Sequence, residues 1–272
     1  MINRVAMASL PMYDFPEVRS ATDAWWCGLA RHLRREGIAD VPAQLLRRDD
    51  LIEQWNDPSL VLSQTCGYLL THQLSGVVQP IATPHYAVAG CAGPTYSSVI
   101  LTRIEYSGRG LGDFRGGVAV FSRPYSHAGY NAFRGIIAPL AGGQPFFAEV
   151  INSGSHLGSI ASLARGQGDL ATVDCIIYAF VSRFRPQMLS GTCALGYTAA
   201  VPAAPYVAPI GASADTVARL RRAIGDALAD PSLAGARSDL FIGGFSFDDA
   251  PEYDCISALE EAASRHGYPV LR

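Results

Sequence analysis

Three turns in the middle of the chain carry residues that could bind an anion. The first covers residues 126–131 (SHAGYN), which follow an apolar run over 116–121 and open an amphipathic helical pattern. A serine at that place can cap a helix, and the N–H groups of a first helical turn, which lack acceptors within the helix, attract an oxyanion. The same residues also fit a plain helix cap without a ligand. The candidate ligand contacts in this turn are Ser126, His127, Gly129 and Asn131.

The second and third turns repeat this arrangement. Ser155 and His156 join another apolar run to a helical pattern, where Ser155 can cap the helix and His156 can offer a ring N–H or serve only a structural role. Asp174 ends a short apolar run and precedes a further helical pattern. Its carboxylate could accept a hydrogen bond from a ligand amine or hydroxyl, or could cap the next helix, and both interpretations stay open.

The first part of the chain offers a second group of candidates. One tyrosine follows the first predicted strand, and residues 63–68 (SQTCGY) follow the third. A tyrosine supplies an apolar wall with a hydroxyl, and the backbone of residues 65–68 can donate N–H groups. The candidates in this group are Tyr13, Ser63, Thr65, Cys66, Gly67 and Tyr68.

The elements that must position these residues form two series of alternating strands and helices. In the first series, we expect strands over 3–10, 41–46, 59–63 and 77–82, with helices over 17–35 and 50–55 and a short helix that ends near Leu74. In the second series, we expect strands over 116–121, 146–151 and 170–173 and helices over 127–140, 155–164 and 175–183. The tail adds a strand from Tyr206 and helices over 215–229 and 251–266. Such alternation predicts mainly parallel sheets, in which ligands bind beyond the carboxyl ends of the strands.

Two extended segments, 96–104 and 193–201, flank the second series. This is the pattern of a chain that leaves one lobe, builds a second and returns. We therefore predict an α/β protein of two doubly wound lobes joined by two crossover strands. Lobe 1 comprises residues 1–98 and 200–272, and lobe 2 comprises residues 99–199. The ligand cleft is expected between the lobes, with the crossover strands acting as hinges.

Composition excludes several classes of protein. The chain has 272 residues, a net charge of −3 and no cluster of basic residues beyond two helical faces, so we expect no nucleic-acid partner. It has no apolar run long enough for a transmembrane helix and no secretory signal, which indicates a cytosolic or already trimmed protein. The six cysteines lack metal-ligand spacing, so neither a metal site nor a disulfide framework is indicated. We expect a monomer without a cofactor.

Taken together, six short blocks resemble one known family. The blocks are residues 8–14, 63–68, 126–131, 154–156, 168–169 and 174–175. In order and spacing they are similar to the phosphate/phosphite/phosphonate substrate-binding proteins of ABC transporters, over most of residues 5–210. In the better-known phosphonate binders the turn that matches Ser126 is of a Ser-Thr-Ser-Gly type, whereas residues 126–129 here read S-H-A-G.

The resemblance implies a type 2 periplasmic-binding-protein fold and a solute-binding function for an ABC-type uptake system. It implies a small-molecule ligand, an oxyanion or an aminophosphonate-like compound, with the oxyanion at the helix start that matches Ser126. It also implies an ABC permease as partner and a periplasmic location, although the missing signal leaves a cytoplasmic location open.

Two other functions use the same architecture. An enzyme could employ Cys66 or a serine as nucleophile and His72, His127 or His156 as base. However, the chain has no G-x-S-x-G, HExxH, Walker A or GxGxxG motif, so we expect no catalytic residues. A cytosolic ligand sensor, or a biosynthetic enzyme on the same fold, remains the alternative to a transport binding protein.

Overall fold

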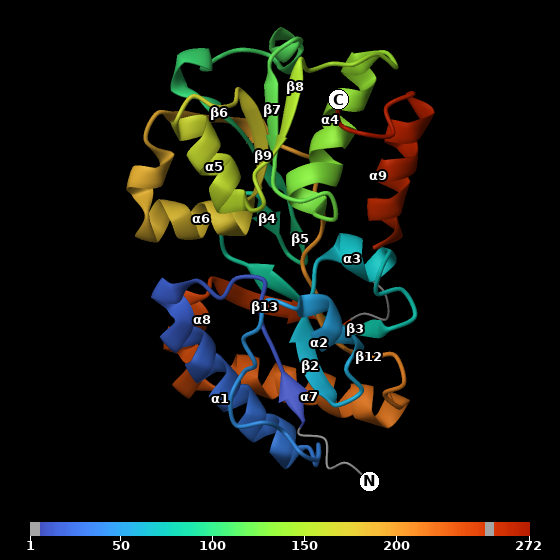
Figure 1. The fold of residues 1–272 in the computed structure, drawn as a ribbon. Coiled ribbons are helices and arrows are strands. Elements are labelled where there is room, and N and C mark those ends of the chain that lie inside the picture. The colour runs from blue at the N-terminus through green and yellow to red at the C-terminus, as the bar shows by residue number, and fades with distance from the viewer. Residues whose placement is uncertain (1–5, 248–252) are drawn as a thin grey trace. The chain divides into compact units, whose positions relative to one another are not determined.

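The computed structural model describes residues 6–247 and 253–272. These residues form two compact units, and Figure 1 labels their elements. Unit 1 contains residues 6–87, 92–94 and 202–247, and unit 2 contains residues 88–91, 95–201 and 253–272. The start of the strand expected over 3–10 and the start of the helix expected over 251–266 lie outside the described residues.

Unit 1 is built on a mixed five-stranded sheet in the order β1-β2-β12-β3-β13. The strands are β1 (Met7–Ala8), β2 (Leu60–Gln64), β12 (Tyr206–Pro209), β3 (Val78–Tyr86) and β13 (Ile242–Ser246). β1 and β2 are parallel, but β12 lies between β2 and β3 and is antiparallel to both. The expectation of a mainly parallel sheet is therefore wrong for this unit, because a strand from the tail of the chain inserts beside β2.

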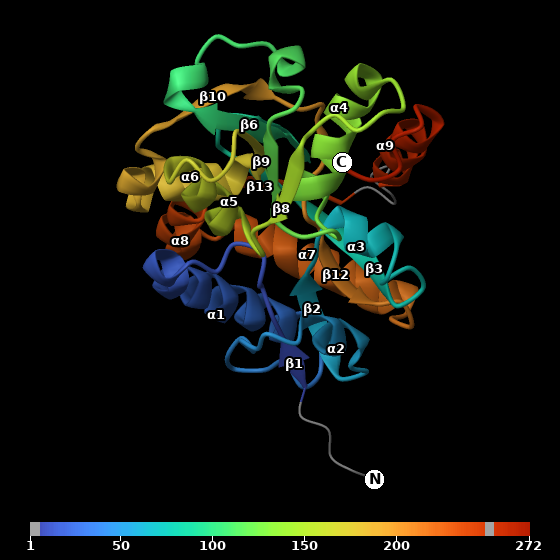
Figure 2. The same ribbon diagram turned by 45° about the horizontal axis from the view of Figure 1, so that its top comes forward.

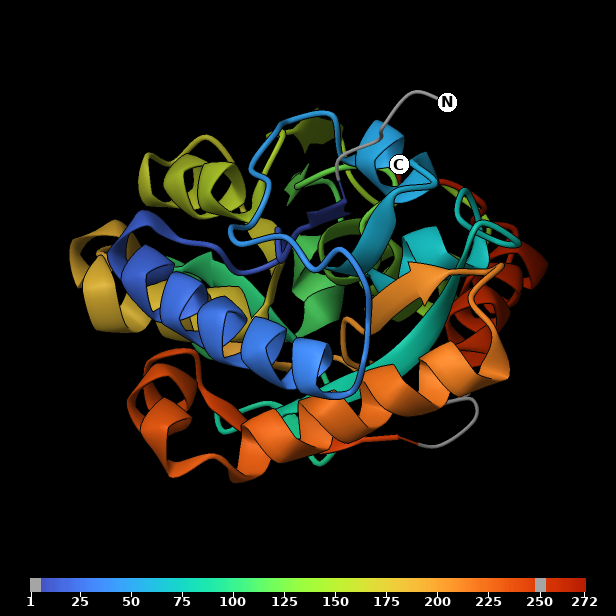
Figure 3. The same cartoon turned by 90° about the horizontal axis from the view of Figure 1, so that it is seen from below.

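Helices cover the sheet of unit 1. They are α1 (Arg19–Arg35), α2 (Leu51–Asn56), α3 (Gly67–Thr71), α7 (Ala214–Ala229) and α8 (Ala234–Asp239), with 3₁₀ turns at Pro16–Val18 and Pro231–Leu233. α1 and α7 pack side by side (Figure 3), and the inner face of α1 buries Trp25, Leu29 and Leu33 completely. Burial of such large side chains is the main favourable contribution to folding.

Two strand predictions in unit 1 fail. Residues 41–46 form no strand, although Leu46 N donates a hydrogen bond to Ala8 O. Conversely, β13 was not expected, because Gly243 and Gly244 give it low intrinsic strand propensity. Pairing with β3 over four registered positions forms the strand despite this composition.

Unit 2 has a second five-stranded sheet in the order β10-β6-β9-β7-β8. The strands are β10 (Thr192–Tyr197), β6 (Ser98–Arg103), β9 (Leu170–Asp174), β7 (Val118–Phe121) and β8 (Glu149–Asn152). β7 is parallel to both β8 and β9, so the carboxyl ends of these three strands lie at one edge of the sheet. The three turns singled out in the sequence all follow these ends. A separate sheet of short strands has the order β11-β5-β4, formed by Val201–Pro202, Thr95–Tyr96 and Cys91–Ala92.

The helices of unit 2 lie on both faces of its sheet. They are α4 (Ala132–Ala141), α5 (His156–Ala164), α6 (Cys175–Phe184) and α9 (Asp254–Arg265), with a single-turn π-helix at His127–Asn131 and 3₁₀ turns at Ile104–Tyr106, Leu111–Phe114 and Pro186–Leu189. Figures 1 and 2 show α5 and α6 on one face and α4 and α9 on the other. Within the described parts of both units, no helix has the length and apolar character needed to cross a membrane.

The C-terminal helix belongs to unit 2, whereas we predicted that residues 200–272 all join lobe 1. Arg134, which is buried on α4, forms an ion pair of 3.0 Å with Glu260 of α9. Phe146 N donates a hydrogen bond of 2.7 Å to Arg272 O, and Tyr268 and Leu271 join the core around Phe133. The periodicity of an amphipathic helix shows which face is buried but not against which partner, so the sequence could not decide this point.

Replacing Asn131 should destabilise unit 2. The buried Asn131 side chain donates to Ile256 O at 3.0 Å and accepts from Arg134 at 2.6 Å, so it links α4 to α9. Asn131→Ala leaves both partners buried without this amide and should lower the free energy of unfolding by about 2–3 kcal/mol. Urea denaturation followed by circular dichroism measures this. Asn56→Ala on the exposed end of α2 is the control and should change stability by less than about 0.5 kcal/mol. An equal loss in both variants contradicts the role assigned to Asn131.

Acid should weaken unit 2 through His127. Burial lowers the pKa of this histidine to about 4, compared with 6.5 in an exposed chain. Between these values the unfolded chain binds a proton that the folded protein excludes, so the free energy of unfolding decreases as the pH falls from 7 to 4. The loss is about 2–3 kcal/mol at 1.36 kcal/mol per pKa unit. Urea unfolding at both pH values should show a smaller loss for His127→Gln than for the wild type, and equal losses contradict this prediction.

Candidate functional site

The first two predicted turns of unit 2 meet at Gly129. A Cβ atom at this position would overlap Ser122 Oγ at the end of β7 and would lie 3.0 Å from His156 Cε1 at the start of α5. Glycine therefore allows the π-helical turn to rest directly on both neighbours. The turn is also fixed from β9, because Thr172 Oγ1 donates a hydrogen bond of 2.7 Å to Ala128 O. The structure thus brings together the first and second turns on one edge of the sheet.

The first turn has the geometry of a capped helix start. Ser126 Oγ accepts a hydrogen bond of 3.0 Å from Gly129 N, so its own O–H remains available as a donor. The earliest N–H groups of a helix have no acceptor within the helix backbone. His127 and Asn131 of the same turn face the interior: His127 packs edge-on against Tyr96 and accepts from Asn131 Nδ2 at 3.4 Å. Of the predicted residues in this turn, Ser126 and Gly129 form the cap, and His127 and Asn131 have their side chains in the interior.

The second turn supplies a neutral imidazole. Ser155 Oγ accepts from Gly158 N at 3.0 Å and caps α5. His156 Nδ1 accepts from Asp174 N at 3.5 Å, which leaves the proton of the neutral ring on Nε2. Burial, followed by the positive charge of Arg123, lowers the pKa of His156 to about 4. At neutral pH this side chain is an uncharged hydrogen-bond donor.

Asp174 is a helix cap in the structure. Its Oδ1 accepts hydrogen bonds from Ile176 N at 2.8 Å and Ile177 N at 3.2 Å, at the start of α6. The carboxylate is buried. Of the two interpretations that the sequence left open, the capping geometry is the one observed, and the Asp174 backbone also orients His156.

Two residues that the sequence analysis did not single out lie at the same place. Arg123 Nε donates a hydrogen bond of 2.7 Å to Gly154 O, so its guanidinium connects the first two turns, and it has no ion-pair partner in the described part of the chain. Ser122 Oγ is buried and has no hydrogen-bond partner among the described residues. A buried hydroxyl in that condition is a group that a ligand or ordered water would satisfy. The sequence feature that could have indicated these two residues is their position directly after a predicted strand.

The unit 1 candidates divide between core and loop. Ser63 is a core residue, because its Oγ is 2.7 Å from Ser9 Oγ and accepts from Trp55 Nε1 at 3.0 Å. Thr65 is buried, and its Oγ1 has no hydrogen-bond partner among the described residues. Cys66 precedes α3, Gly67 is its first residue, and Tyr68 stacks on His72 with ring centroids 3.9 Å apart.

Tyr13 lies close to the same loop of unit 1. Its ring packs edge-on against Tyr86 at 5.1 Å, and the Tyr86 hydroxyl accepts a hydrogen bond of 2.9 Å from Gln64, the residue before Thr65. The structure therefore connects the loops that follow β1 and β2, as expected for neighbouring parallel strands.

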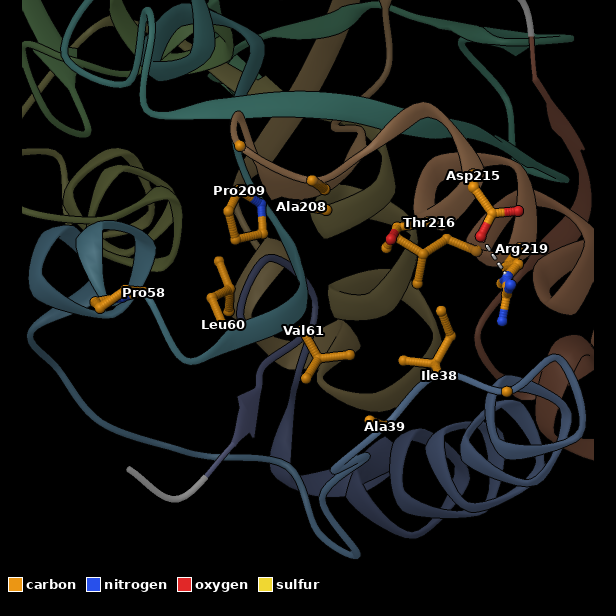
Figure 4. Close-up of a pocket in the computed structure, with 14 residues that line it drawn as sticks. Ile38, Ala39, Pro58, Leu60, Val61, Ala208, Pro209, Asp215, Thr216 and Arg219 are labelled. Carbon is orange, nitrogen blue, oxygen red and sulfur yellow. Dashed lines mark ion pairs between the residues drawn. The ribbon is translucent and has the colours of Figure 1, made fainter. Parts of the chain in front are cut away.

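A separate pocket of about 760 Å³ lies elsewhere in unit 1 (Figure 4). Its walls include Ile38, Leu60 and Pro209, and an ion pair of 2.8 Å between Asp215 and Arg219 stands at one side. Leu60 is the first residue of β2, whereas the predicted loop follows the end of that strand. This pocket is thus not formed by the residues that the sequence indicated.

Comparison with known proteins identifies the fold. Three solved structures are similar over nearly the whole chain. A binding protein component of an ABC phosphonate transporter from Pseudomonas aeruginosa has a TM-score of 0.74 and 16% identity, covering 96% of this chain and 87% of that one. PhnD1 from Prochlorococcus marinus in complex with methylphosphonate has a TM-score of 0.71 and 12% identity, covering 96% and 99%. A Xanthomonas citri protein bound to ATP has a TM-score of 0.71 and 15% identity, covering 97% and 98%. These likenesses confirm the predicted α/β, type 2 periplasmic-binding-protein fold.

The family follows from a sequence match. A search of curated protein sequences gives no match. A family model described as "ABC transporter, phosphonate, periplasmic substrate-binding protein" matches residues 56–246, which is well over half of the chain. The family resemblance seen in the sequence is thereby confirmed. The chain belongs to the periplasmic substrate-binding proteins of ABC phosphonate transporters, and its role is that of a solute-binding protein.

Proposed function

We propose that this protein binds a small tetrahedral oxyanion, a phosphonate or phosphate, at the turns of unit 2 and delivers it to an ABC permease. The observation that carries the proposal is the contact at Gly129, which holds the turn after β7 against the start of α5. The donors near it are of the kind that an oxyanion requires: the backbone N–H groups of a first helical turn, the Ser126 hydroxyl and the His156 ring N–H. Such donors carry no negative charge, so they do not repel an anionic ligand.

Arg123 supplies the positive charge in this proposal. Its guanidinium is tied to Gly154 O and has no carboxylate in an ion pair among the described residues, so its charge remains available to an anion. An arginine can donate two parallel hydrogen bonds to a phosphonate or phosphate group. Its charge also favours the neutral form of His156. In this proposal Arg123 offers the ligand a positive charge, and His156 offers it an uncharged N–H donor.

The proposal extends to unit 1. The buried Thr65 hydroxyl has no partner among the described residues, and Tyr13, Cys66, Gly67 and Tyr68 belong to the loops beside it. We propose that these residues also contact the ligand.

Binding without catalysis is part of the same proposal. The family is one of transporter binding proteins. Burial holds the pKa of His127 and of His156 at about 4, which makes both weak bases at neutral pH. A sensor would use the same ligand contacts and differ only in its partner. The periplasmic location of the family and a permease partner follow for this chain as proposals.

A ligand screen tests the function. Thermal unfolding of the purified protein should be measured with methylphosphonate, 2-aminoethylphosphonate, phosphite and phosphate, and with sulfate and malate as non-phosphorus controls. A ligand at 100 times its Kd stabilises the native state by about 2.7 kcal/mol, which raises Tm by several degrees. We expect this rise with at least one phosphorus oxyanion. No rise with any of the four, or an equal rise with malate, would contradict the proposal.

Neutralising Arg123 tests the site. Arg123→Gln removes a charge-assisted contact and should weaken binding of the best oxyanion from the screen by about 10- to 100-fold. It should also reduce the dependence of Kd on salt. Isothermal titration at two ionic strengths measures both effects. Arg165→Gln, an exposed arginine that follows α5 in the same unit, is the matched control and should leave Kd unchanged. If both variants bind like the wild type, the site lies elsewhere.

A further inference from the structure

Two cysteines that are distant in sequence touch in unit 2. Cys91 Sγ lies 3.4 Å from Cys175 Sγ, although the residues are 84 positions apart. Cys91 closes the turn that begins at Val88, and Cys175 is the first residue of α6. Cys175 is buried and Cys91 is partly exposed. The sequence analysis found no disulfide framework, because these positions have no spacing that would reveal them.

The backbone holds both cysteines through one residue. Ser97 N donates a hydrogen bond of 2.9 Å to Gly90 O, and Cys175 N donates one of 3.2 Å to Ser97 O. The turn that carries Cys91 and the start of α6 are therefore fixed to the same short segment. Their sulfur atoms meet because of this shared anchor.

Gly90 makes the approach possible. It has a φ of +90°, a conformation that side chains rarely adopt. A Cβ atom here would lie 2.7 Å from the Tyr197 ring and 3.0 Å from Cys175 Cβ. Any larger residue would push the turn away from α6. The backbone conformation at Gly90 therefore determines the close approach of the two thiols.

We propose that Cys91 and Cys175 form a disulfide bond that ties the turn at residues 88–91 to the start of α6. The bond requires the sulfurs to move from 3.4 Å to about 2.05 Å apart, a small change for two side chains already in contact. The proteins of this family are periplasmic, and disulfides form and persist in that oxidising compartment.

The reaction proceeds by exchange with a small disulfide such as oxidised glutathione. The Cys91 thiolate attacks one glutathione sulfur, forms a mixed disulfide and releases one glutathione thiolate. The Cys175 thiolate then attacks the Cys91 sulfur and releases the second, so two protein thiols are oxidised and one glutathione disulfide is reduced to two thiols. Cys91 reacts first because it is accessible, whereas the hydrogen bond with Cys91 and burial raise the pKa of Cys175.

The bond also constrains the connection between the units. The chain passes from unit 2 to unit 1 between Cys91 and Ala92. A disulfide at Cys91 fixes the last residue of unit 2 before this passage. It also fixes the start of α6, next to the Asp174 cap that orients His156.

The test is a thiol count on the full chain. The protein is equilibrated with oxidised glutathione, denatured, alkylated and analysed by mass spectrometry. We expect two of the six thiols to be protected, so that only four alkyl groups are added. The mass should then be two hydrogens below that of a chain with four alkylated and two free thiols. Dithiothreitol should restore all six reactive thiols. Thermal unfolding should give a Tm about 5–10 °C higher for the oxidised protein.

Variants identify the pair. Cys91→Ser should leave its remaining thiols reactive, and Cys175→Ser, which lacks the second thiol, should keep Cys91 joined to glutathione, whereas Cys193→Ser should still protect two. Cys91→Ser changes a partly exposed side chain and carries the test if the buried Cys175 variant does not fold. The proposal is overturned if the wild type keeps six reactive thiols. It is also overturned if Cys91 of the wild type stays joined to glutathione, or if protection survives Cys91→Ser.

Discussion

The candidate site depends on one steric constraint, the absence of a side chain at position 129. The turn after β7 lies on Ser122 and against His156 because no Cβ atom separates them. This contact joins loops from two neighbouring parallel strands. Thr172 adds the third strand through its hydrogen bond to Ala128 O. The polar groups of these loops therefore lie close together because the backbones pack against each other. Attraction between the polar groups is not needed for this.

The chemistry of the converged groups suits an anion because nearly all of them are neutral donors. Ser126 accepts from Gly129 N and keeps its O–H, and His156 accepts at Nδ1 and keeps its proton on Nε2. The low pKa of His156 means that this donor does not gain charge between pH 5 and 8. Among the described residues of these turns the positive charge comes from Arg123, which is exposed. In the proposed site the donors are fixed dipoles and one cation, so the charge of the protein's own groups there changes little between pH 5 and 8.

The sequence predicted local features well and distant pairings poorly. The caps at Ser126, Ser155 and Asp174 follow from residue type beside a strand end, and the structure shows each of them. The fold class also follows from the alternation of strands and helices. By contrast, Ser63 was selected by its place in a loop motif, but hydrogen bonds to Ser9 and Trp55 place it in the core. A partner 54 residues away, as Ser9 is, cannot be read from a local pattern.

The same reason explains what the sequence missed. Arg123 and Ser122 matter only because another loop lies beside them, and periodicity carries no information about that neighbour. The docking of α9 on unit 2 and the insertion of β12 beside β2 are decided in the same way, by tertiary contacts that outweigh chain order. Hydrophobic patterns of period 2 and 3.6 show which face of a strand or helix is buried. Which element packs on that face depends on the shape of the partner's surface.

A site fixed in this manner limits where ligand discrimination can arise. Ser126, His156 and Arg123 are each held by a hydrogen bond that exists without a ligand. Immobilising a flexible side chain on binding costs about 0.5–1.5 kcal/mol. Because these side chains are already held, a ligand would add little of this cost. In the proposed site, however, these donors pair with the oxygens that phosphate, phosphite and phosphonates share. Under the proposal, selection among these ligands falls to side chains outside the three turns, and Tyr13, Thr65 and Tyr68 supply the aromatic and hydroxyl groups for it.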